Sequence, residues 1–255
     1  MKPIKKSDCL CFSKKNQNLE LFYKYDSPPL KEPNYKIKKY KRKIMRCKIC
    51  GHFTAKHNIK VQEFYKKNYS IISHGKQMIK KFKYINKLKE KSDNYHRVKR
   101  VLLYFKKILK SDVCLLDVGS GLSVFLYQLQ KKVKWYLIGV EPDINSVRFA
   151  RKMKLNVIHS NFKYSLFKGK VLNIITMNKI IEHVKNPISL LKISKKLLSK
   201  NGYVYIEVPD GEAASKSLEG KERQEFFVDH LHVFTKKSLK RCIQLSGLKL
   251  LKMKN

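Results

Sequence analysis

The chain has 255 residues and 43% of them are hydrophobic, which is enough for one domain with a sizeable core and a small appendage. Its 58 Lys and Arg residues outnumber 19 Asp and Glu residues, so the formal net charge is +39. A charge of this size ordinarily indicates nucleic acid or a membrane surface as a partner. Because the basic residues are mostly Lys and are spread along the whole chain, we attribute the charge largely to composition. The dense run at residues 36–46 keeps a polyanionic partner open.

No apolar run approaches the roughly 20 residues that a membrane helix needs. The N-terminal residues lead into a polar stretch and not into the apolar core of a secretory signal. We therefore expect no membrane span and a cytoplasmic protein.

Residues 1–70 hold four of the six cysteines, in two closely spaced pairs. These are Cys9, Cys11, Cys47 and Cys50. A C-x-x-C-G turn brings two thiolates to one metal ion, and two pairs can complete the four-cysteine tetrahedron of a structural zinc site. The sequence predicts such a site on all four residues, because a segment with so few apolar residues needs a staple.

Two alternatives to the four-cysteine site stay open. The first pair has a single residue between its cysteines, so His52 or His57 could replace one ligand. Free thiols in a reducing compartment are the other alternative. Cys114 and Cys242 stand in apolar patterns and are expected in the core.

Residues 71–92 are expected to form a helical linker between this zinc-binding segment, 1–70, and a main domain, 93–255. Ser92 or Asp93 could cap a helix at the start of that domain. Its apolar face would carry residues at helical spacing, namely Val98, Val101, Leu102, Phe105, Ile108 and Leu109.

The most informative segment follows this helix. Residues 113–118 are a short apolar run typical of a buried strand, and a helical pattern begins at Leu122. Between them, Gly119 and Gly121 allow a tight turn. A strand, a glycine turn and a helix N-terminus form a cradle for a nucleotide. Glu141 ends the next expected strand, 135–140, at a distance typical of a carboxylate that binds ribose hydroxyls.

The spacing Asp117-x-Gly119-x-Gly121-x-Ser123 resembles motif I of the class I S-adenosylmethionine-dependent methyltransferases, although Ser123 stands where a third glycine is usual. Further segments resemble this family in the same order: 140–143, 157–161, 173–178, 180–187 and 197–209. The resemblance implies an α/β fold, a Rossmann-like doubly wound and mainly parallel sheet. Residues 247–253 would supply a sixth strand, which leaves the last of the usual seven strands absent.

The resemblance also implies S-adenosylmethionine as the cofactor. The residues carried over for its binding are Asp117, Gly119, Ser120, Gly121, Glu141, Pro142, Asn161 and Asn178. Asn161 replaces the Asp that is usual after the third strand. Residues 211–220 are a polar, glycine-flanked segment that we expect to be a loop over the substrate.

Methyltransferases with an N-terminal zinc-binding segment, some of which act on sugar carbons, are similar to this layout. Their motifs resemble residues 64–69, 91–98 and 229–235. The resemblance implies His230 as general base, aided by Asp229 and by Tyr69. The alternatives are that His230 only fixes the substrate cover and that Tyr69 only packs. For His183 a pocket-lining role is at least as well supported as catalysis, and His232 is expected to be structural.

We therefore predict an enzyme that methylates a sugar, as a nucleotide-sugar or a unit of a surface saccharide, at carbon or oxygen. Methylation of RNA is the first alternative, with residues 36–46 and the zinc knuckle as its anchor. A non-catalytic binding module that retains the fold is the second alternative, because Ser123 and Asn161 depart from the family pattern.

Overall fold

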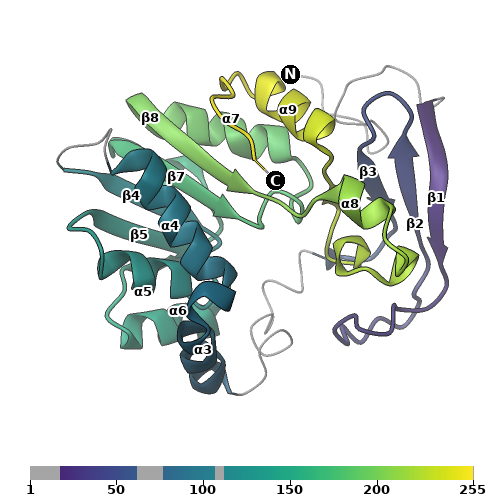
Figure 1. Ribbon diagram of the computed structural model, residues 1–255, viewed down its shortest axis with the longest axis horizontal. Helices are drawn as coiled ribbons and strands as arrows, with labels where there is room; N and C mark the ends of the chain where they lie inside the picture. Colours follow the sequence, from purple (N-terminus) through teal and green to yellow (C-terminus); the bar gives the residue numbers. More distant parts are fainter. Residues whose placement is uncertain (1–17, 62–76, 107–111, 255) are drawn as a thin grey trace. The chain divides into compact units, whose positions relative to one another are not determined.

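The computed structural model describes residues 18–61, 77–106 and 112–254 (Figure 1). The predicted site residues Cys9, Cys11 and Tyr69 lie outside the described residues. The chain divides into two compact units. The unit that we call the parallel unit comprises residues 62–178 and 196–207, and the antiparallel unit comprises residues up to 61, 179–195 and everything from 208 onward.

A five-stranded sheet forms the centre of the parallel unit. In sheet order its strands are β6 (Val157–His159), β5 (Tyr136–Glu141), β4 (Cys114–Val118), β7 (Leu172–Asn178) and β8 (Leu198–Glu207). All neighbours run parallel, and Leu116 of β4 pairs with Ile138 on one side and Ile175 on the other. These five strands confirm the predicted α/β Rossmann-like sheet, and β4 and β5 each begin one residue after the predicted start.

The helices of the parallel unit lie around this sheet (Figure 1). They are α3 (Met78–Lys87), α4 (Asp93–Phe105), α5 (Val124–Gln130) and α6 (Ile144–Lys152), with 3-10 turns at η2 (Lys89–Lys91) and η3 (Tyr164–Leu166). The described part of the expected linker, 71–92, consists mainly of α3 and η2. Ser92, one of the two predicted caps, is the N-cap residue of α4, although its side chain makes no capping hydrogen bond.

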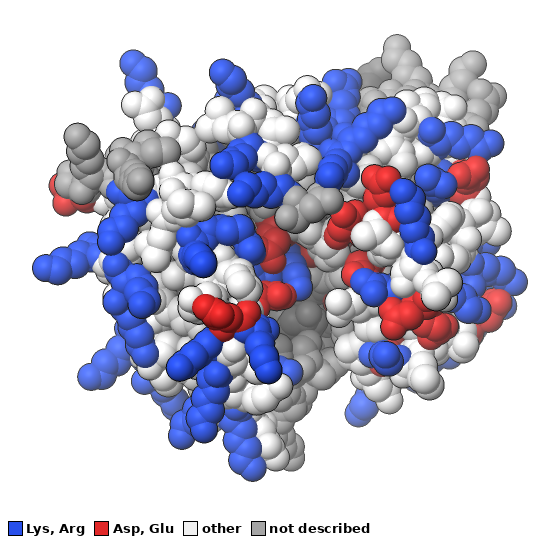
Figure 2. Space-filling view, viewed as in Figure 1, with Lys and Arg blue, Asp and Glu red and all other residues white. Residues whose placement is uncertain are grey.

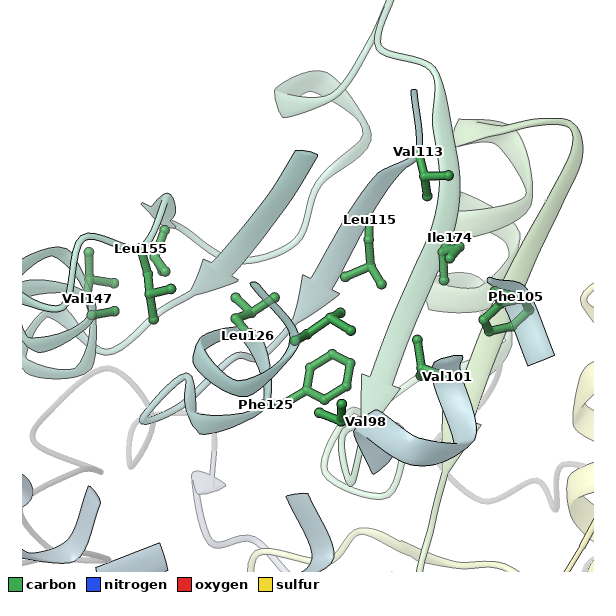
Figure 3. Packing of buried hydrophobic residues seen from close by; sticks show 13 residues of the cluster. Val98, Val101, Phe105, Val113, Leu115, Phe125, Leu126, Val147, Leu155 and Ile174 are labelled. Atoms are coloured by element: carbon green, nitrogen blue, oxygen red, sulfur yellow. The ribbon is translucent and has the colours of Figure 1, made fainter. Parts of the chain in front are cut away.

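The core of the parallel unit lies where α4 and α5 pack on β4 and β7 (Figure 3). Val98 and Val101 come from the predicted apolar face of α4, and Phe125 and Leu126 come from α5. They surround Leu115, which has no exposed surface. Burying large apolar side chains stabilises a fold by roughly 1.5–3 kcal/mol each, so this cluster fixes the helix that follows the glycine turn.

An antiparallel sheet in the order β1-β2-β3-β9 organises the other unit. Its strands are β1 (Leu19–Tyr25), β2 (Arg42–Cys47), β3 (Phe53–Lys56) and β9 (His232–Val233). The last strand comes from a distant part of the sequence, and pairs His232 with Thr54. Phe53 of β3 and Phe226 pack edge to face, with ring centroids 5.6 Å apart.

The remaining elements belong to the C-terminal half of the chain. They are α7 (Pro187–Leu197), α8 (Gly211–Ser215), η4 (Gly220–Glu222), η5 (Gln224–Phe226) and α9 (Lys236–Leu245). The helix α9 begins with a capping box formed by Thr235 and Ser238.

Two predictions for the C-terminal half are wrong. Residues 211–220 are not simply a loop, because Asp210 accepts hydrogen bonds from Glu212 N and Ala213 N and so begins α8. Residues 247–253 form no strand, although they were expected to supply the sixth. Lys residues at 249, 252 and 254 interrupt this short apolar run, and the parallel sheet ends at β8.

Figure 2 shows Lys and Arg scattered over the visible face, with Asp and Glu in fewer, smaller groups. Among the residues that the structure describes, no helix is long and apolar enough to span a membrane.

Candidate functional site

The glycine turn after β4 has the backbone conformation that its sequence predicts. Gly119 and Gly121 have φ values of +69° and +50°, in the left-handed region that favours glycine. Gly119 N–H donates to the carbonyl of Val140 at 2.8 Å, which ties the turn to the neighbouring strand. Ser123 also has a positive φ, of +55°, and this explains why a third glycine is usual at its position.

A third glycine, Gly139, lets the sheet approach this turn closely. A Cβ atom at Gly139 of β5 would lie 2.9 Å from Ser120 Oγ and 3.0 Å from Leu126 Cδ1. At Gly121, by contrast, a Cβ atom would meet nothing within 4 Å, so this side of the turn is open. The turn is therefore packed against β5 on one side and accessible to a ligand on the other.

Glu141 is bound to the turn by its carboxylate. Its Oε2 accepts from Gly121 N–H and its Oε1 from Asp143 N–H, both at 2.9 Å. Burial raises the pKa of Glu141 to about 7, against the opposing effect of these two N–H groups. A carboxylate oxygen has two lone pairs, so each oxygen can still accept a hydroxyl of a ligand. Pro142 follows, and Asp143 then caps α6.

Asp117 lies at the end of β4, beside β7, where the strand order of the sheet reverses. In open α/β sheets this is where ligands bind. Its Oδ1 accepts from Thr176 Oγ1 at 2.7 Å and from Asn178 Nδ2 at 3.0 Å. Burial raises the pKa of Asp117 to about 6, and the two donors oppose this shift.

Two buried polar atoms near this point have no hydrogen-bond partner within the described part of the chain. They are Ser120 Oγ and Asn178 Oδ1. A buried polar group without a partner is costly, and a ligand with donors and acceptors would remove that cost. The hydroxyl of Ser120 and the amide oxygen of Asn178 thus fit a polar nucleoside. Asn161 lies two residues beyond the end of β6 and is exposed.

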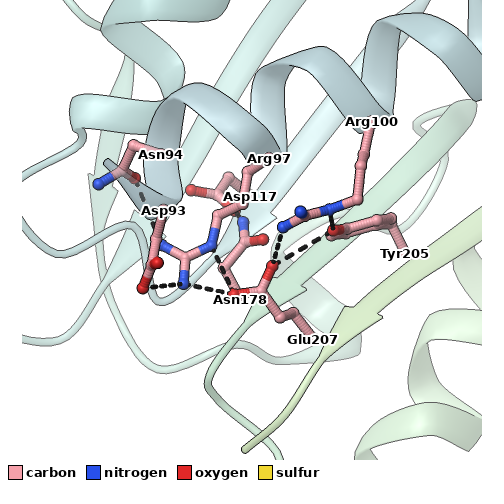
Figure 4. Close-up of polar contacts among 8 residues, drawn as sticks. All are labelled: Asp93, Asn94, Arg97, Arg100, Asp117, Asn178, Tyr205 and Glu207. Atoms are coloured by element: carbon pink, nitrogen blue, oxygen red, sulfur yellow. Dashed lines mark hydrogen bonds and ion pairs between the residues drawn. The ribbon is translucent and has the colours of Figure 1, made fainter. Parts of the chain in front are cut away.

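A network of charged residues that sequence reasoning missed holds α4 to the end of β8 (Figure 4). Arg97 donates twice to Glu207 Oε1, at 2.9 and 2.6 Å, and Arg100 donates to Glu207 Oε2 at 2.7 Å. Tyr205 accepts from Arg100 Nε at 2.8 Å. Burial alone would raise the pKa of Glu207, but the two guanidinium groups hold it below its usual value.

A signal for this network was present in the sequence. Arg97 and Glu207 stand in two of the segments that resemble family motifs, 91–98 and 197–209. Opposite charges in separate motifs indicate a pair only once the fold brings them together. The network fixes the helix next to Asp117, whose carboxylate also experiences the charge of Arg97.

In the antiparallel unit, Cys47 and Cys50 lie on one turn between β2 and β3. Gly51 closes it by donating to Cys47 O at 2.8 Å, with a φ of +70°. Both thiols are buried, with exposures of 0% and 4%. Thr235 Oγ1 donates to Cys50 O at 3.0 Å, so the start of α9 supports the turn. The geometry is compatible with two ligands of a zinc knuckle.

His52, an alternative zinc ligand, pairs with His232, which was expected to be structural. His52 Nε2 lies 3.0 Å from His232 Nδ1, and both rings are buried. Burial lowers the pKa of His232 to about 4 and that of His52 well below its usual value. Both are therefore neutral at pH 7 and link β9 to the end of the knuckle. Of the cysteines expected in the core, Cys242 is buried and Cys114 is only partly so.

The candidate base lies in a second histidine cluster of the same unit. The rings of His183 and His230 meet edge to face, with centroids 4.6 Å apart. His230 Nδ1 donates to Glu225 O at 2.9 Å, and His183 Nδ1 donates to Asp229 O at 2.9 Å. The carboxylate of Asp229 lies 3.7 Å from His183 Nδ1. His183 Nδ1 therefore lies against Asp229, and the predicted help that Asp229 gives to His230 stays a prediction.

The fold and the nucleotide cradle together define a class I S-adenosylmethionine-dependent methyltransferase. Residues 90–253 match the family described as "Methyltransferase domain", which is more than half of the chain. The protein belongs to this family and is an enzyme that transfers a methyl group from S-adenosylmethionine.

Solved structures agree on the fold. The plantazolicin methyltransferase BamL, in complex with a triazolic desmethylPZN analog and SAH, is 18% identical with a TM-score of 0.52, covering 73% of each chain. A chain from the complex between the Haloferax volcanii Trm112 methyltransferase activator and a methyltransferase is 13% identical with a TM-score of 0.54, covering 77% of this chain and 80% of that one. None of the curated proteins is similar enough to count as a match.

Proposed function

We propose that this methyltransferase acts on a sugar, as a nucleotide-sugar or a unit of a surface saccharide. The observation that carries the proposal is the folding of residues 229–235 onto the Cys47–Cys50 turn, through the β3–β9 pairing and the Thr235 hydrogen bond. These are the two features that resemble sugar C-methyltransferases with an N-terminal zinc-binding segment. Their association in one unit supports the same arrangement here.

The residues of the cradle would hold the adenosyl group. Glu141 would accept the ribose hydroxyls, and Ser120 and Asn178 offer polar atoms that have no partner within the described residues. Gly119 and Gly121 allow close approach of the backbone, while Asp117, Pro142 and Asn161 complete the set at the strand ends. S-adenosylmethionine supplies, when bound, the methyl group and the leaving group, so the protein contributes position and proton removal.

His230 is the proposed general base. Its Nδ1–H is held by Glu225 O, which leaves the lone pair on Nε2 to accept a proton from the acceptor carbon or hydroxyl. The acceptor atom then forms its bond to the methyl carbon, and the electron pair of the breaking bond remains on the leaving sulfur. Asp229 is proposed as a positioning residue for the neighbouring His183, and Tyr69 remains a proposed contributor that lies outside the described residues.

Turnover with a panel of acceptors tests this proposal. Methyl-labelled S-adenosylmethionine would be incubated with nucleotide-linked sugars and, in parallel, with generic RNA at two salt concentrations. Label in a sugar is the expected result. Salt-sensitive labelling of RNA alone would contradict it, because phosphate contacts weaken with salt.

The role of His230 has its own test. His230→Gln should lower turnover about 10²–10³-fold, in the range of general base catalysis, with unchanged affinity for SAH. His96→Gln is the matched control, because His96 is exposed and lies in α4. Equal turnover of both variants would contradict the assignment.

We also propose that Cys9, Cys11, Cys47 and Cys50 bind a structural zinc ion. The buried cysteine turn supports this proposal, and a closed thiolate site would couple metal binding to folding. Purified wild-type protein should hold one more zinc ion per chain than Cys50→Ser, whereas Cys114→Ser should hold as much zinc as the wild type. Metal analysis after dialysis against zinc that finds equal metal in both variants would contradict the site.

A further inference from the structure

A buried carboxylate next to the histidine pair has no role in the methyl transfer described above. Glu182 is 1% exposed, and neither Oε1 nor Oε2 has a hydrogen-bond partner among the residues that the structure describes. Buried carboxylates are ordinarily paired, hydrogen-bonded or bound to a metal. Glu182 follows β7 in the chain and lies beside β9. Its backbone carbonyl accepts hydrogen bonds from Leu231 N–H and His232 N–H.

The unpartnered carboxylate faces the two histidines. One oxygen of Glu182 and one ring nitrogen each of His183 and His230 all lie within 4.8 Å of one another. A tetrahedral ion with bonds of about 2.0–2.2 Å places its ligand atoms roughly 3.4 Å apart. Side-chain rotations that shorten the separations of the three atoms by at most about 1.4 Å would therefore bring them to one ion.

The hydrogen bonds of the two rings suit them to this role. Each histidine uses Nδ1 to donate to a backbone carbonyl, His183 to Asp229 O and His230 to Glu225 O. The lone pair of each ring is then on Nε2. Metal-binding histidines almost always donate their other N–H to a carbonyl or a carboxylate in this way, and the Asp229 carboxylate at 3.7 Å from His183 reinforces the pattern.

We propose that Glu182, His183 and His230 form a binding site for one divalent transition ion of the zinc class. Two histidines and one carboxylate are a recurrent ligand set for Zn²⁺, and they leave a fourth position open. This site differs from the cysteine site, since it holds no sulfur and lies on other segments of the chain. All three ligands belong to the antiparallel unit.

The site has a consequence for the proposed reaction, and this consequence alone rests on the proposed function. The Nε2 lone pair of His230 cannot bind an ion and accept a proton at the same time. Turnover should therefore fall when zinc is added and recover when a chelator removes it. Binding of the ion itself does not depend on methyl transfer, so the two proposals can fail separately.

The test is a titration of the full-length protein with Co²⁺, followed by its visible and near-ultraviolet absorption. Ions at thiolates give an intense sulfur charge-transfer band, whereas an ion on two histidines and a carboxylate gives only the weaker visible bands. With the cysteine site occupied by its own zinc ion, we expect wild-type protein to bind one Co²⁺ whose visible bands grow without the sulfur band. Glu182→Gln should weaken this binding by more than the roughly 10–100-fold that outer-shell partners contribute.

Two further variants keep the proposal falsifiable. Asp229→Asn should weaken the same binding by less than tenfold, because it removes the carboxylate charge 3.7 Å from His183 Nδ1 but keeps the backbone carbonyl that accepts the Nδ1–H. His96→Gln should bind Co²⁺ as wild type does. Thermal unfolding without added metal confirms that each variant is folded. Equal stoichiometry and affinity in wild type and a folded Glu182→Gln variant would overturn the proposal.

Discussion

The parallel and antiparallel units differ in how they treat their buried carboxylates. In the parallel unit Asp117, Glu141 and Glu207 each accept at least two hydrogen bonds, so their positions are fixed before any ligand arrives. In the antiparallel unit Glu32 is similarly held, but Glu182 has no partner among the described residues. The comparison teaches that a cradle for an organic cofactor is preorganised by hydrogen-bond donors of the backbone and of neighbouring side chains. A carboxylate left without donors instead indicates a ligand that supplies positive charge.

The largest effect is expected where the antiparallel unit is held by a fully buried ion pair. Arg42 and Glu32 have side-chain exposures of 0% and 1%, and Glu32 also accepts from Tyr40 Oη at 2.7 Å and Val228 N at 2.6 Å. Glu32→Gln leaves a buried guanidinium without its counter-charge and should lower the free energy of unfolding by about 3–5 kcal/mol.

Denaturant unfolding measures this change. Asp26→Asn is the control, because Asp26 pairs with Lys24 on the surface with both side chains 61% exposed. It should change stability by at most about 1 kcal/mol. A loss for Glu32→Gln no larger than that of the control would show that the buried pair does not hold the unit together.

The next effect concerns the cofactor cradle and pH. The pKa of Glu141 is raised from 4.5 to about 7, so between these values the folded protein holds a proton that the unfolded chain has released. The stability contributed by this proton is present at low pH and is lost as the pH rises through 7. We expect the ribose hydroxyls of SAH to bind the ionised carboxylate. The affinity for SAH should therefore rise as the pH rises through 7, while this contribution to stability falls.

Between pH 8 and pH 5 the affinity should weaken about 100-fold, which follows from tenfold per unit below the pKa. Calorimetric titration with SAH at several pH values measures this dependence. The Glu141→Gln variant should bind SAH more weakly, and its affinity should have lost most of the pH dependence. An affinity for SAH that is independent of pH in the wild type would argue against the ribose contact.

A smaller loss is expected from the ion network of the parallel unit. Glu207→Gln removes the counter-charge of Arg97, but the side chains are 19% and 9% exposed, so solvent screens part of the interaction. We expect a loss of about 2 kcal/mol, below the range for a fully buried pair. Asp93→Asn, with Asp93 65% exposed at 3.7 Å from Arg97, should have almost no effect.

Comparing the two Glu→Gln variants sharpens the contrast between the units. If Glu207→Gln destabilises the protein more than Glu32→Gln, the anchoring of α4 on β8 outweighs burial in deciding the energy of an ion pair. Unfolding curves in the same denaturant give this ranking directly.

The smallest effect is a gain. Ser123 is 1% exposed and has a φ of +55°, a conformation that costs a non-glycine residue roughly 1–2 kcal/mol. Ser123→Gly should raise the free energy of unfolding by about 1 kcal/mol, since the added freedom of the unfolded chain offsets part of the relief. Gly121→Ser is the converse variant and should be destabilising. A loss of stability in Ser123→Gly would mean that the serine hydroxyl matters more than backbone strain.

The sequence by itself determined most of the parallel unit. Its strands are short apolar runs, its turn has glycines at positions with positive φ, and its helix α4 has an apolar face that is buried. These signals are local, because strand, turn and helix follow one another along the chain. The positions of Asp117 and Glu141 at strand ends followed from the same local order.

Only the tertiary structure decided the antiparallel unit. The pairing of Thr54 with His232 and the closeness of Glu182 to His230 join segments that are far apart in the chain, and neither follows from a local pattern. The expected strand at 247–253 is also absent, since an edge strand forms only where a neighbour accepts its hydrogen bonds. Local propensity sets the elements, but contacts between distant segments choose which side chains share a site.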